Sequence, residues 1–234
     1  MNRVLLCVDV SNQVYKAAAV HPTLSSEGRF TGGLFGFLHA IAKAIIFTKA
    51  TDLILCLDSP PYLRSKAYPE YKRLRADNKD EDLATKARET KAQVLELANH
   101  LGLPVWGLPG FESDDLIAHA ARRYRHRFDQ IVAMSNDSDL NQLFCYPNFY
   151  IWKGKKGRYE RGDFYREWGL EPDELVLALA MTGTHNEVAG IDGIGPVSAR
   201  VAIKNPVKLR ELRQKHAVVI DRNIALIHLP HPEF

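Results

Sequence analysis

Seven carboxylates stand where short apolar runs of the sequence end or where helix-like segments begin. Asp9 and Asp58 follow the apolar runs at residues 4–8 and 53–57. The other acids lie in two short segments, and they are Glu112, Asp114, Asp115, Asp137 and Asp139. In open α/β sheets, ligands bind at the edge formed by the carboxyl ends of the strands. We therefore expect these acids to gather at one edge of a sheet.

Each acid also has an ordinary structural explanation. An Asp after a strand often caps a helix, and acids in a first helical turn complement the helix dipole. Gathered together, however, the carboxylates would repel one another, and several would have to bind protons unless a cation compensated them. An all-oxygen ligand set without His or Cys favours magnesium or manganese over zinc. The sequence therefore predicts a site for Mg²⁺ or Mn²⁺.

A basic and aromatic segment follows Asp58 closely. Its basic residues are Arg64, Lys66, Lys72, Arg73 and Arg75, and they are interleaved with Tyr68 and Tyr71. Basic side chains bind phosphates, and aromatic rings stack on unpaired bases, so the segment is typical of a nucleic-acid contact. The structural alternative is a solvated basic helix.

A second candidate contact is the glycine-rich segment that contains Gly193, Ile194 and Gly195 and is followed by Arg200. Glycines let the backbone approach a phosphate closely, and a helix that follows supplies unpaired amides at its N-terminus. The alternative is an ordinary glycine-rich start of a helix. Both segments point to DNA as a partner.

Strand-like and helix-like segments alternate over most of the chain, which predicts a doubly wound, mostly parallel sheet flanked by helices. The expected strands are residues 4–8, 53–57, 103–106 and 130–134, and the expected helices are residues 32–49, 82–101, 112–125, 171–181 and 197–204. The 234 residues, 46% of them hydrophobic, suffice for one large α/β domain with a small appendage. We place that domain at residues 1–164 and a helical subdomain at residues 165–234.

The cysteines and the apolar runs bear on the compartment. The sequence has three cysteines, Cys7, Cys56 and Cys145, and this odd number without a pairing pattern argues against a disulfide framework. The sequence contains no Cys-x-x-Cys pair of the kind that would indicate a zinc site. From the strand-like run at its start we expect no signal peptide, and no apolar stretch of the sequence is as long as a membrane span. We expect a cytoplasmic, nucleoid-associated monomer with no membrane partner.

Five segments, in the same order along the chain, give the sequence a resemblance to a known family. They are VLLCVDVSN, LILCLDSPPYLRSKAYPEYKRLR, GFESDDLIA, AMSNDSDLNQL and GIDGIGPVSAR. The sequence resembles the flap endonuclease and 5′–3′ exonuclease family, especially its bacterial polymerase-associated and bacteriophage members, from about residue 4 to residue 229. The resemblance implies a PIN-like nuclease fold, a bacterial or phage-infected cell, and DNA with a flap, a branch or a free 5′ end as substrate.

The resemblance also implies roles for individual residues in a two-metal hydrolysis of phosphodiester bonds. Asp9, Asp58, Glu112 and Asp114 correspond to the first-metal group, with Asp115 beside them acting through water. Asp137 and Asp139 correspond to ligands of the second metal.

The family's arch over the active site corresponds to about residues 62–82 of this sequence. Lys72 and Arg75 take the place of the Lys and Arg that contact the scissile phosphate. The residues Arg64, Lys66, Tyr68, Tyr71 and Arg73 are the arch's other expected DNA contacts. The turn at Gly193, Ile194 and Gly195 corresponds to the family's helix-turn-helix variant, whose carbonyls also bind a monovalent cation such as K⁺.

The sequence departs from the family at one place. A segment Gly-Asp-x-x-Asp-Asn normally precedes the glycine-rich turn, and its aspartates complete the second metal site. Here residues 183–190 read GTHNEVAG, and Asn186 takes the place of one aspartate, with His185 and Glu187 as its neighbours. This departure keeps a second hypothesis open, in which the chain binds branched DNA with little or no cleavage. A third and more distant alternative is a nuclease-like domain that acts on RNA.

Overall fold

A six-stranded sheet organises the computed structural model, which describes residues 2–72, 80–184 and 188–234. The strands lie in the order β5-β4-β1-β6-β7-β8. Their bounds are β1 (Val4–Asp9), β4 (Asp52–Cys56), β5 (Val105–Trp106), β6 (Gln130–Met134), β7 (Phe149–Trp152) and β8 (Arg158–Tyr159). All neighbours pair in parallel except β7 and β8, which are antiparallel. The chain leaves β1 toward β4 on one side and reaches β6 on the other, so the topological switch point lies at β1.

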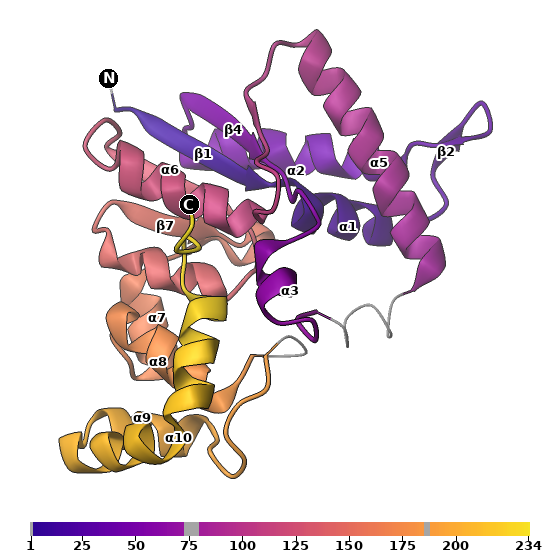
Figure 1. Cartoon of the computed structure of the whole chain (residues 1–234). Helices are drawn as coiled ribbons and strands as arrows, with labels where there is room; N and C mark the ends of the chain where they lie inside the picture. Colours follow the sequence, from indigo (N-terminus) through magenta and orange to yellow (C-terminus); the bar gives the residue numbers. More distant parts are fainter. Residues whose placement is uncertain (1, 73–79, 185–187) are drawn as a thin grey trace.

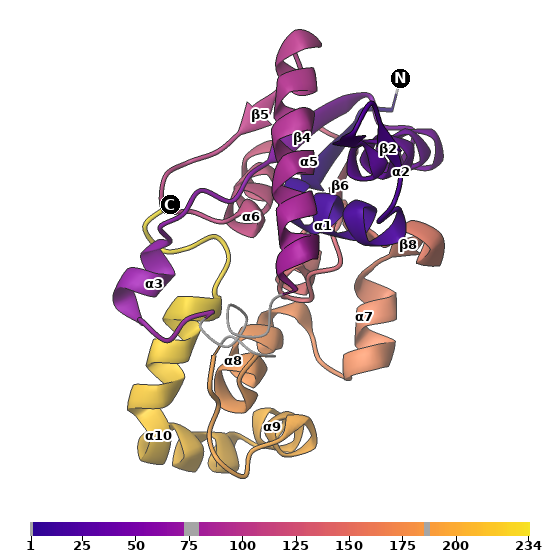
Figure 2. The ribbon, with the colours of Figure 1, turned by 90° about the vertical axis from the view of Figure 1, so that its right-hand side faces the viewer.

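Helices cover both faces of the sheet because its central strand is apolar on both (Figures 1 and 2). From β1, Val4, Leu6 and Val8 pack in a core with the helices α1 (Val10–Val20), α2 (Gly32–Thr48) and α5 (Glu81–His100). Leu5 and Cys7 of the same strand face the opposite core, which contains α6 (Ser113–Tyr124). This alternation is the period of two that a strand imposes on its side chains.

The remaining elements are short connections and a group of helices below the sheet in Figure 1. The connections are the hairpin β2 (Ser25–Ser26) and β3 (Arg29–Phe30), the helix α3 (Leu63–Ala67), and the 3₁₀ helices η1 (Asp139–Cys145) and η2 (Gly154–Lys156). The helical group comprises α7 (Arg161–Trp168), α8 (Pro172–Thr182), α9 (Pro196–Ile203) and α10 (Pro206–Ile227). Prolines at the first helical positions and Asn205, whose side chain accepts from the amides of Val207 and Lys208, explain where α9 and α10 begin.

The predicted fold class is confirmed, since the sheet is mostly parallel and flanked by helices. Strand β6 has the predicted bounds, and the other predicted strands and helices agree to within about two residues. The predicted division at residues 164 and 165 falls inside α7, and one apolar core joins Ile131 of the sheet to Leu175 of α8 and Leu226 of α10. The two-part division remains a prediction. In the described part of the chain, no helix is both long enough and apolar enough to cross a membrane.

Candidate active site

Asp9 lies at the centre of the sheet edge where the parallel strands end. It is the last residue of β1 and the N-cap of α1, and it is 6% exposed. Its Oδ1 accepts a hydrogen bond of 3.1 Å from the amide of Asn12, and this bond satisfies one of the otherwise unpaired donors of the helix. The capping role expected of an isolated Asp is therefore present, and it fixes the carboxylate at the switch point of the sheet.

Two serines brace the carboxylates at this edge. The Ser113 hydroxyl donates to Asp9 at 3.0 Å, and the Ser113 amide donates to Asp58 at 2.9 Å. The Ser135 hydroxyl, at the end of β6, donates to the second oxygen of Asp9 at 2.8 Å and accepts from the amide of Asp137 at 3.1 Å. Neither serine was predicted from the sequence, although each stands within two residues of a predicted metal-binding acid.

Burial and neighbouring charges raise the pKa values of two acids at this edge, Asp9 and Asp114. Burial, and then the charge of Asp58, raises the pKa of Asp9 to about 6. Burial, together with the charges of Glu112 and Asp115, raises the pKa of Asp114 well above its usual range. The charge of Asp137, in the segment after β6, also raises the pKa of Asp114. Such a cluster binds either protons or a cation at neutral pH.

Three acids at the start of α6 lie together, and they have different partners. Carboxylate oxygens of Glu112, Asp114 and Asp115 lie within 4.8 Å of one another. Asp115 is fully buried and accepts from Arg64 with both oxygens, at 2.6 and 2.8 Å, from the amide of Glu112 at 3.1 Å and from the amide of His231 at 2.7 Å. A carboxylate offers about four acceptor positions. Those of Asp115 are therefore engaged by protein donors, and we assign it to holding Arg64 rather than a metal.

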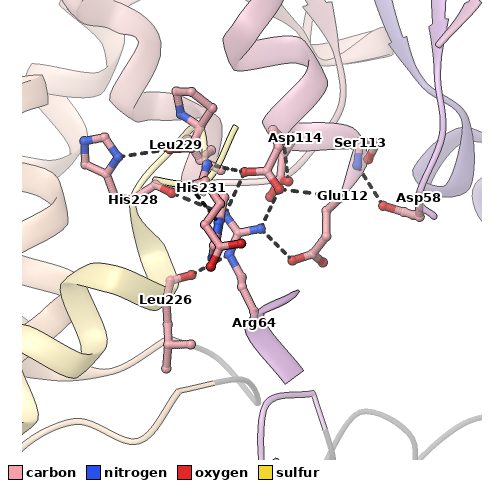
Figure 3. Close-up of polar contacts among 12 residues, drawn as sticks. Asp58, Arg64, Glu112, Ser113, Asp114, Leu226, His228, Leu229 and His231 are labelled. Atoms are coloured by element: carbon pink, nitrogen blue, oxygen red, sulfur yellow. Dashed lines mark hydrogen bonds and ion pairs between the residues drawn. The ribbon is translucent and has the colours of Figure 1, made fainter. Parts of the chain in front are cut away.

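The surroundings of Arg64 argue against the DNA contact that was expected from its place in a basic run. Its side chain is 3% exposed, and the guanidinium lies among protein acceptors (Figure 3). All five of its N–H groups have partners, which are Glu112, Asp115 twice, and the carbonyl oxygens of Leu226 and His228. Burial and saturation leave no donor for a phosphate.

Tyr71 is likewise unavailable for stacking on a base. It is 7% exposed, and its hydroxyl donates to Glu112 at 2.9 Å. Lys72 lies beside it, with its ammonium hydrogen-bonded to the other oxygen of Glu112 and 5.3 Å from the centroids of the Tyr62 and Tyr71 rings. Glu112 therefore joins the base of the predicted arch to the acid cluster.

The other predicted arch residues differ in their surroundings. Lys66 is exposed on α3. Tyr68 is half-buried, with its hydroxyl donating to Glu70 at 2.9 Å and the guanidinium of Arg222 4.7 Å from its ring centroid. The predicted contacts Arg73 and Arg75 lie outside the described residues.

The acids fall into two groups according to the metal ion that each is expected to bind. We call Asp9, Asp58, Glu112 and Asp114 the inner acids, and Asp137 and Asp139 the outer acids. Asp137 accepts from the amide of Asp139 at 2.9 Å, a contact within one loop, and both side chains are half-buried. His185, Asn186 and Glu187, at the place where the sequence departs from the family, lie outside the described residues. The inner and outer acids together offer an all-oxygen donor set, in which the pKa values of Asp9 and Asp114 are raised, and such a set fits hard divalent cations such as Mg²⁺ or Mn²⁺.

Lys16, one residue that the sequence analysis missed, adds a positive charge near the inner acids. It lies on α1, and burial lowers its pKa to about 8, an effect that the charge of Asp9 opposes. No spacing in the sequence signals it, because α1 was not among the expected helices.

The glycine-rich turn lies in the helical group, at the start of α9. Gly193 has φ +80°, in the region that favours glycine, and Gly195 caps α9. A Cβ at either position would have nothing within 4 Å, so the backbone is open to a ligand. Ile194 instead packs against the core of Ala180 and Met181. Arg200 is exposed and donates to the carbonyl of Trp168 at 3.3 Å.

The family of the chain follows from a match over most of its length. The family described as 5′-3′ exonuclease, N-terminal resolvase-like domain, matches residues 4–169, and these include every inner and outer acid. The chain belongs to this 5′–3′ exonuclease family. The expectation of a DNA nuclease of the flap endonuclease and 5′–3′ exonuclease type is thereby confirmed.

Relatives of the exonuclease family differ in length. A 5′-3′ exonuclease of Aquifex aeolicus is 30% identical over 200 residues, which cover 84% of this chain and 68% of that protein. A flap endonuclease Xni of Pseudoalteromonas translucida is 26% identical over 209 residues, covering 86% of this chain and 78% of the relative. The chain spans only 20% of DNA polymerase I of Rhizobium leguminosarum, with 29% identity over 208 residues.

Solved structures show the same fold at lower sequence identity. The T5 D15 protein, co-crystallised with metal ions, superposes with a TM-score of 0.80 at 19% identity, over 97% of this chain and 90% of that chain. Flap endonuclease-1 of Methanococcus jannaschii gives a TM-score of 0.64 at 16% identity, over 98% and 79%. These likenesses confirm the predicted PIN-like architecture.

Proposed function

We propose that this chain is a structure-specific 5′ nuclease, which hydrolyses phosphodiester bonds of DNA near a 5′ flap or a free 5′ end. The observation that carries the proposal is the sheet edge, where strands β1, β4 and β6 and helix α6 bring acids together and burial raises the pKa values of Asp9 and Asp114. A protein that only bound DNA would gain nothing from so many mutually repelling carboxylates. Among the relatives, bacteriophage T5 D15 flap endonuclease is described in a pseudo-enzyme-product complex with DNA and metal ions.

The inner acids Asp9, Asp58, Glu112 and Asp114 would hold a first Mg²⁺ or Mn²⁺. The outer acids Asp137 and Asp139 would hold a second ion. Bound divalent ions supply an activated water and stabilise the charge that develops on the phosphate. Ser113 and Ser135 hold the carboxylates of Asp9 and Asp58 in place with neutral donors, which add no positive charge that would compete with a cation.

Basic side chains would position the DNA. Lys72 is hydrogen-bonded to Glu112 on the side of the inner acids that faces the predicted arch. Its ammonium could exchange this bond for one to a phosphate that binds at that edge. We assign Arg75 the same role from the sequence alone, and Lys66, Tyr68 and Arg73 the path of the strand toward it. The turn of Gly193, Ile194 and Gly195, with Arg200 beside it and K⁺ as a candidate ligand of its carbonyls, would hold the phosphates of the duplex farther from the cut.

A second function is favoured by one observation, the absence of the two aspartates at residues 183–190. If the outer acids alone cannot hold the second ion, the chain binds branched DNA without cutting it. The two proposals share the fold and the DNA-binding surface and differ only in the chemical step.

A cleavage assay separates the two proposals. The full chain is incubated with a labelled 5′-flap substrate and with a plain blunt duplex, each with Mg²⁺, with Mn²⁺ and with a chelator. The nuclease proposal predicts cut flap with either metal, faster with Mn²⁺ because it binds most sites more tightly, and no cleavage with the chelator. Lys72→Ala should cut more slowly while its DNA affinity remains. Flap that is bound but uncut at every metal concentration would replace the nuclease with the junction binder.

A further inference from the structure

The segment of residues 226–234 runs from the last turn of α10 back over α6, and we call it the strap (Figures 1 and 3). It reaches the buried guanidinium of Arg64 with two carbonyl groups. The Arg64 Nε donates to the carbonyl of Leu226 at 2.7 Å, and Nη2 donates to that of His228 at 3.2 Å. The amide of His231 donates to Asp115 at 2.7 Å. The strap therefore contacts both members of the ion pair next to the inner acids.

The strap is anchored by groups that do not touch the acids. The side chain of Gln142 in η1 brackets it, donating to the carbonyl of Ile227 at 3.0 Å and accepting from the amide of Leu229 at 3.1 Å. At the far end, the ring of Phe234 packs against Phe111 at 4.8 Å and His119 at 4.6 Å between ring centroids. These anchors fix where the strap carbonyls lie.

Arg64 in turn fixes Glu112. Its Nη1 donates to Glu112 at 2.9 Å, across 48 residues of sequence, while the rest of the guanidinium is held by Asp115 and the strap. A buried guanidinium needs every donor satisfied, because unpaired polar groups and charges are costly to bury. Without the strap, two N–H groups would lose their acceptors, and Arg64 would turn toward water and away from Glu112.

We propose that the strap positions Arg64, and through Arg64 the carboxylate of Glu112, so that residues 226–234 set the metal affinity of the inner acids. Arg64 is then a positioning residue, since it acts on the site through Glu112. Partners that orient metal ligands typically change metal affinity or activity by about 10–100-fold when they are altered. This inference rests on the proposed function, because it takes Glu112 as a ligand of the first ion.

The strap can be loosened at two anchors without touching an acid or Arg64. Gln142→Met removes both bonds to the strap at nearly constant volume, and Phe234→Ala removes the aromatic anchor. The matched control is Asn148→Leu, because the Asn148 amide also braces two backbone carbonyls, those of Arg125 and Phe128, and contacts neither the strap nor an inner acid. Mn²⁺ affinity of the full chain is measured without DNA by electron paramagnetic resonance, and kcat and KM are measured on the 5′-flap substrate.

Each strap variant should weaken Mn²⁺ binding by about tenfold or more, with kcat lowered at limiting metal and recovered at high metal. The KM of the strap variants for DNA should not change. The Mn²⁺ affinity of the control Asn148→Leu should equal that of the original chain. Arg64→Lys keeps the charge but has three donors in place of five, and it should weaken Mn²⁺ binding in the same way. Because Arg64 and Gln142 act in one chain of contacts, the double variant should be no weaker than the worse single variant.

Hydrogen exchange at the amides of Leu229 and His231 reports whether the strap has been released. Faster exchange with unchanged Mn²⁺ affinity in both strap variants would overturn the inference, and so would losses that add fully in the double variant. Should Gln142→Met fail to fold, Phe234→Ala decides alone. If the original chain cuts no DNA but the strap variants still lose Mn²⁺ affinity, the strap inference stands and the nuclease proposal fails.

Discussion

The inner and the outer acids are carboxylates at the same sheet edge, but the protein holds three of the four inner acids, Asp9, Asp58 and Glu112, differently from the outer acid Asp137. Asp9 and Glu112 are held by donors far away in the sequence, such as Ser135 at 126 residues from Asp9 and Arg64 at 48 residues from Glu112. The described contact of Asp137 comes from its own loop, two residues away. Tertiary structure thus organises Asp9, Asp58 and Glu112 before any ligand arrives, whereas the described side-chain contacts of Asp114 and Asp137 come from one and two residues away. We expect the two groups to bind metal with different affinities.

The largest expected effect is that of Asp9→Asn, which removes a central inner acid. Cleavage should fall by about a thousandfold, since a bound metal contributes several kcal/mol and each 1.36 kcal/mol is a factor of ten. The rate of flap cleavage at saturating DNA checks this. A variant that retains most of its activity would show that the inner acids are not the catalytic ones.

The same variant should make the metal-free protein more stable. The folded-state pKa of Asp9 is about 6, above the usual 3.8, so ionising this group opposes folding, and the wild type loses stability as pH rises through 6. At pH 7 the penalty is of the order of 1–3 kcal/mol, which Asn does not carry. Urea unfolding with a chelator should give Asp9→Asn a larger free energy of unfolding than the wild type at pH 7. The difference should shrink toward pH 4. A difference in the free energy of unfolding that does not depend on pH would contradict the raised pKa of Asp9.

The outer acids are tested by the double variant Asp137→Ala with Asp139→Ala. If only these acids hold the second ion, cleavage should be lost, while Mn²⁺ binding at the inner acids remains. The measurement is Mn²⁺ binding without DNA alongside flap cleavage. Equal loss of both would remove the distinction between inner and outer acids.

How far the sequence predicts this site depends on the distance over which each residue is held. Asp9 and Asp58 were predicted because each follows an apolar run, and the end of a parallel strand sets their place. Arg64 was misassigned because a basic residue in a basic run reads as exposed, while its partners lie 48, 51, 162 and 164 residues away. Ser113 and Ser135 were not predicted for the same reason, because their hydroxyls donate hydrogen bonds to Asp9, which lies on strand β1 and far away in the sequence.

A smaller effect is expected where the sequence departs from the family. Asn186 lies outside the described residues, so this prediction rests on the sequence alone. Asn186→Asp returns an acid to the family position, and a gain of about 1.4 kcal/mol would lower the metal concentration needed for half-maximal cleavage about tenfold. The control is Asn148→Asp, which adds the same charge away from the acids. An equal effect in both variants would mean that bulk charge, not the second ion, is responsible.

The smallest expected effect is that of Arg200→Ala, beside the glycine-rich turn. Removing one phosphate contact should weaken binding of flap and duplex alike and reduce the dependence of log Kd on log salt concentration by about one. Fluorescence anisotropy across a salt series measures this slope. A change in cleavage at saturating DNA with an unchanged slope would place Arg200 at the reacting phosphate instead.

Anomalous diffraction from crystals of the full chain soaked in Mn²⁺ tests the central claim most directly. We predict a strong peak within about 2.0–2.6 Å of carboxylate oxygens of the inner acids Asp9, Asp58, Glu112 and Asp114, the distances expected for a hard cation. A weaker peak should lie at Asp137 and Asp139 and grow with Mn²⁺ concentration. No peak among the inner acids at saturating Mn²⁺, or a first peak at the outer acids, would contradict the account.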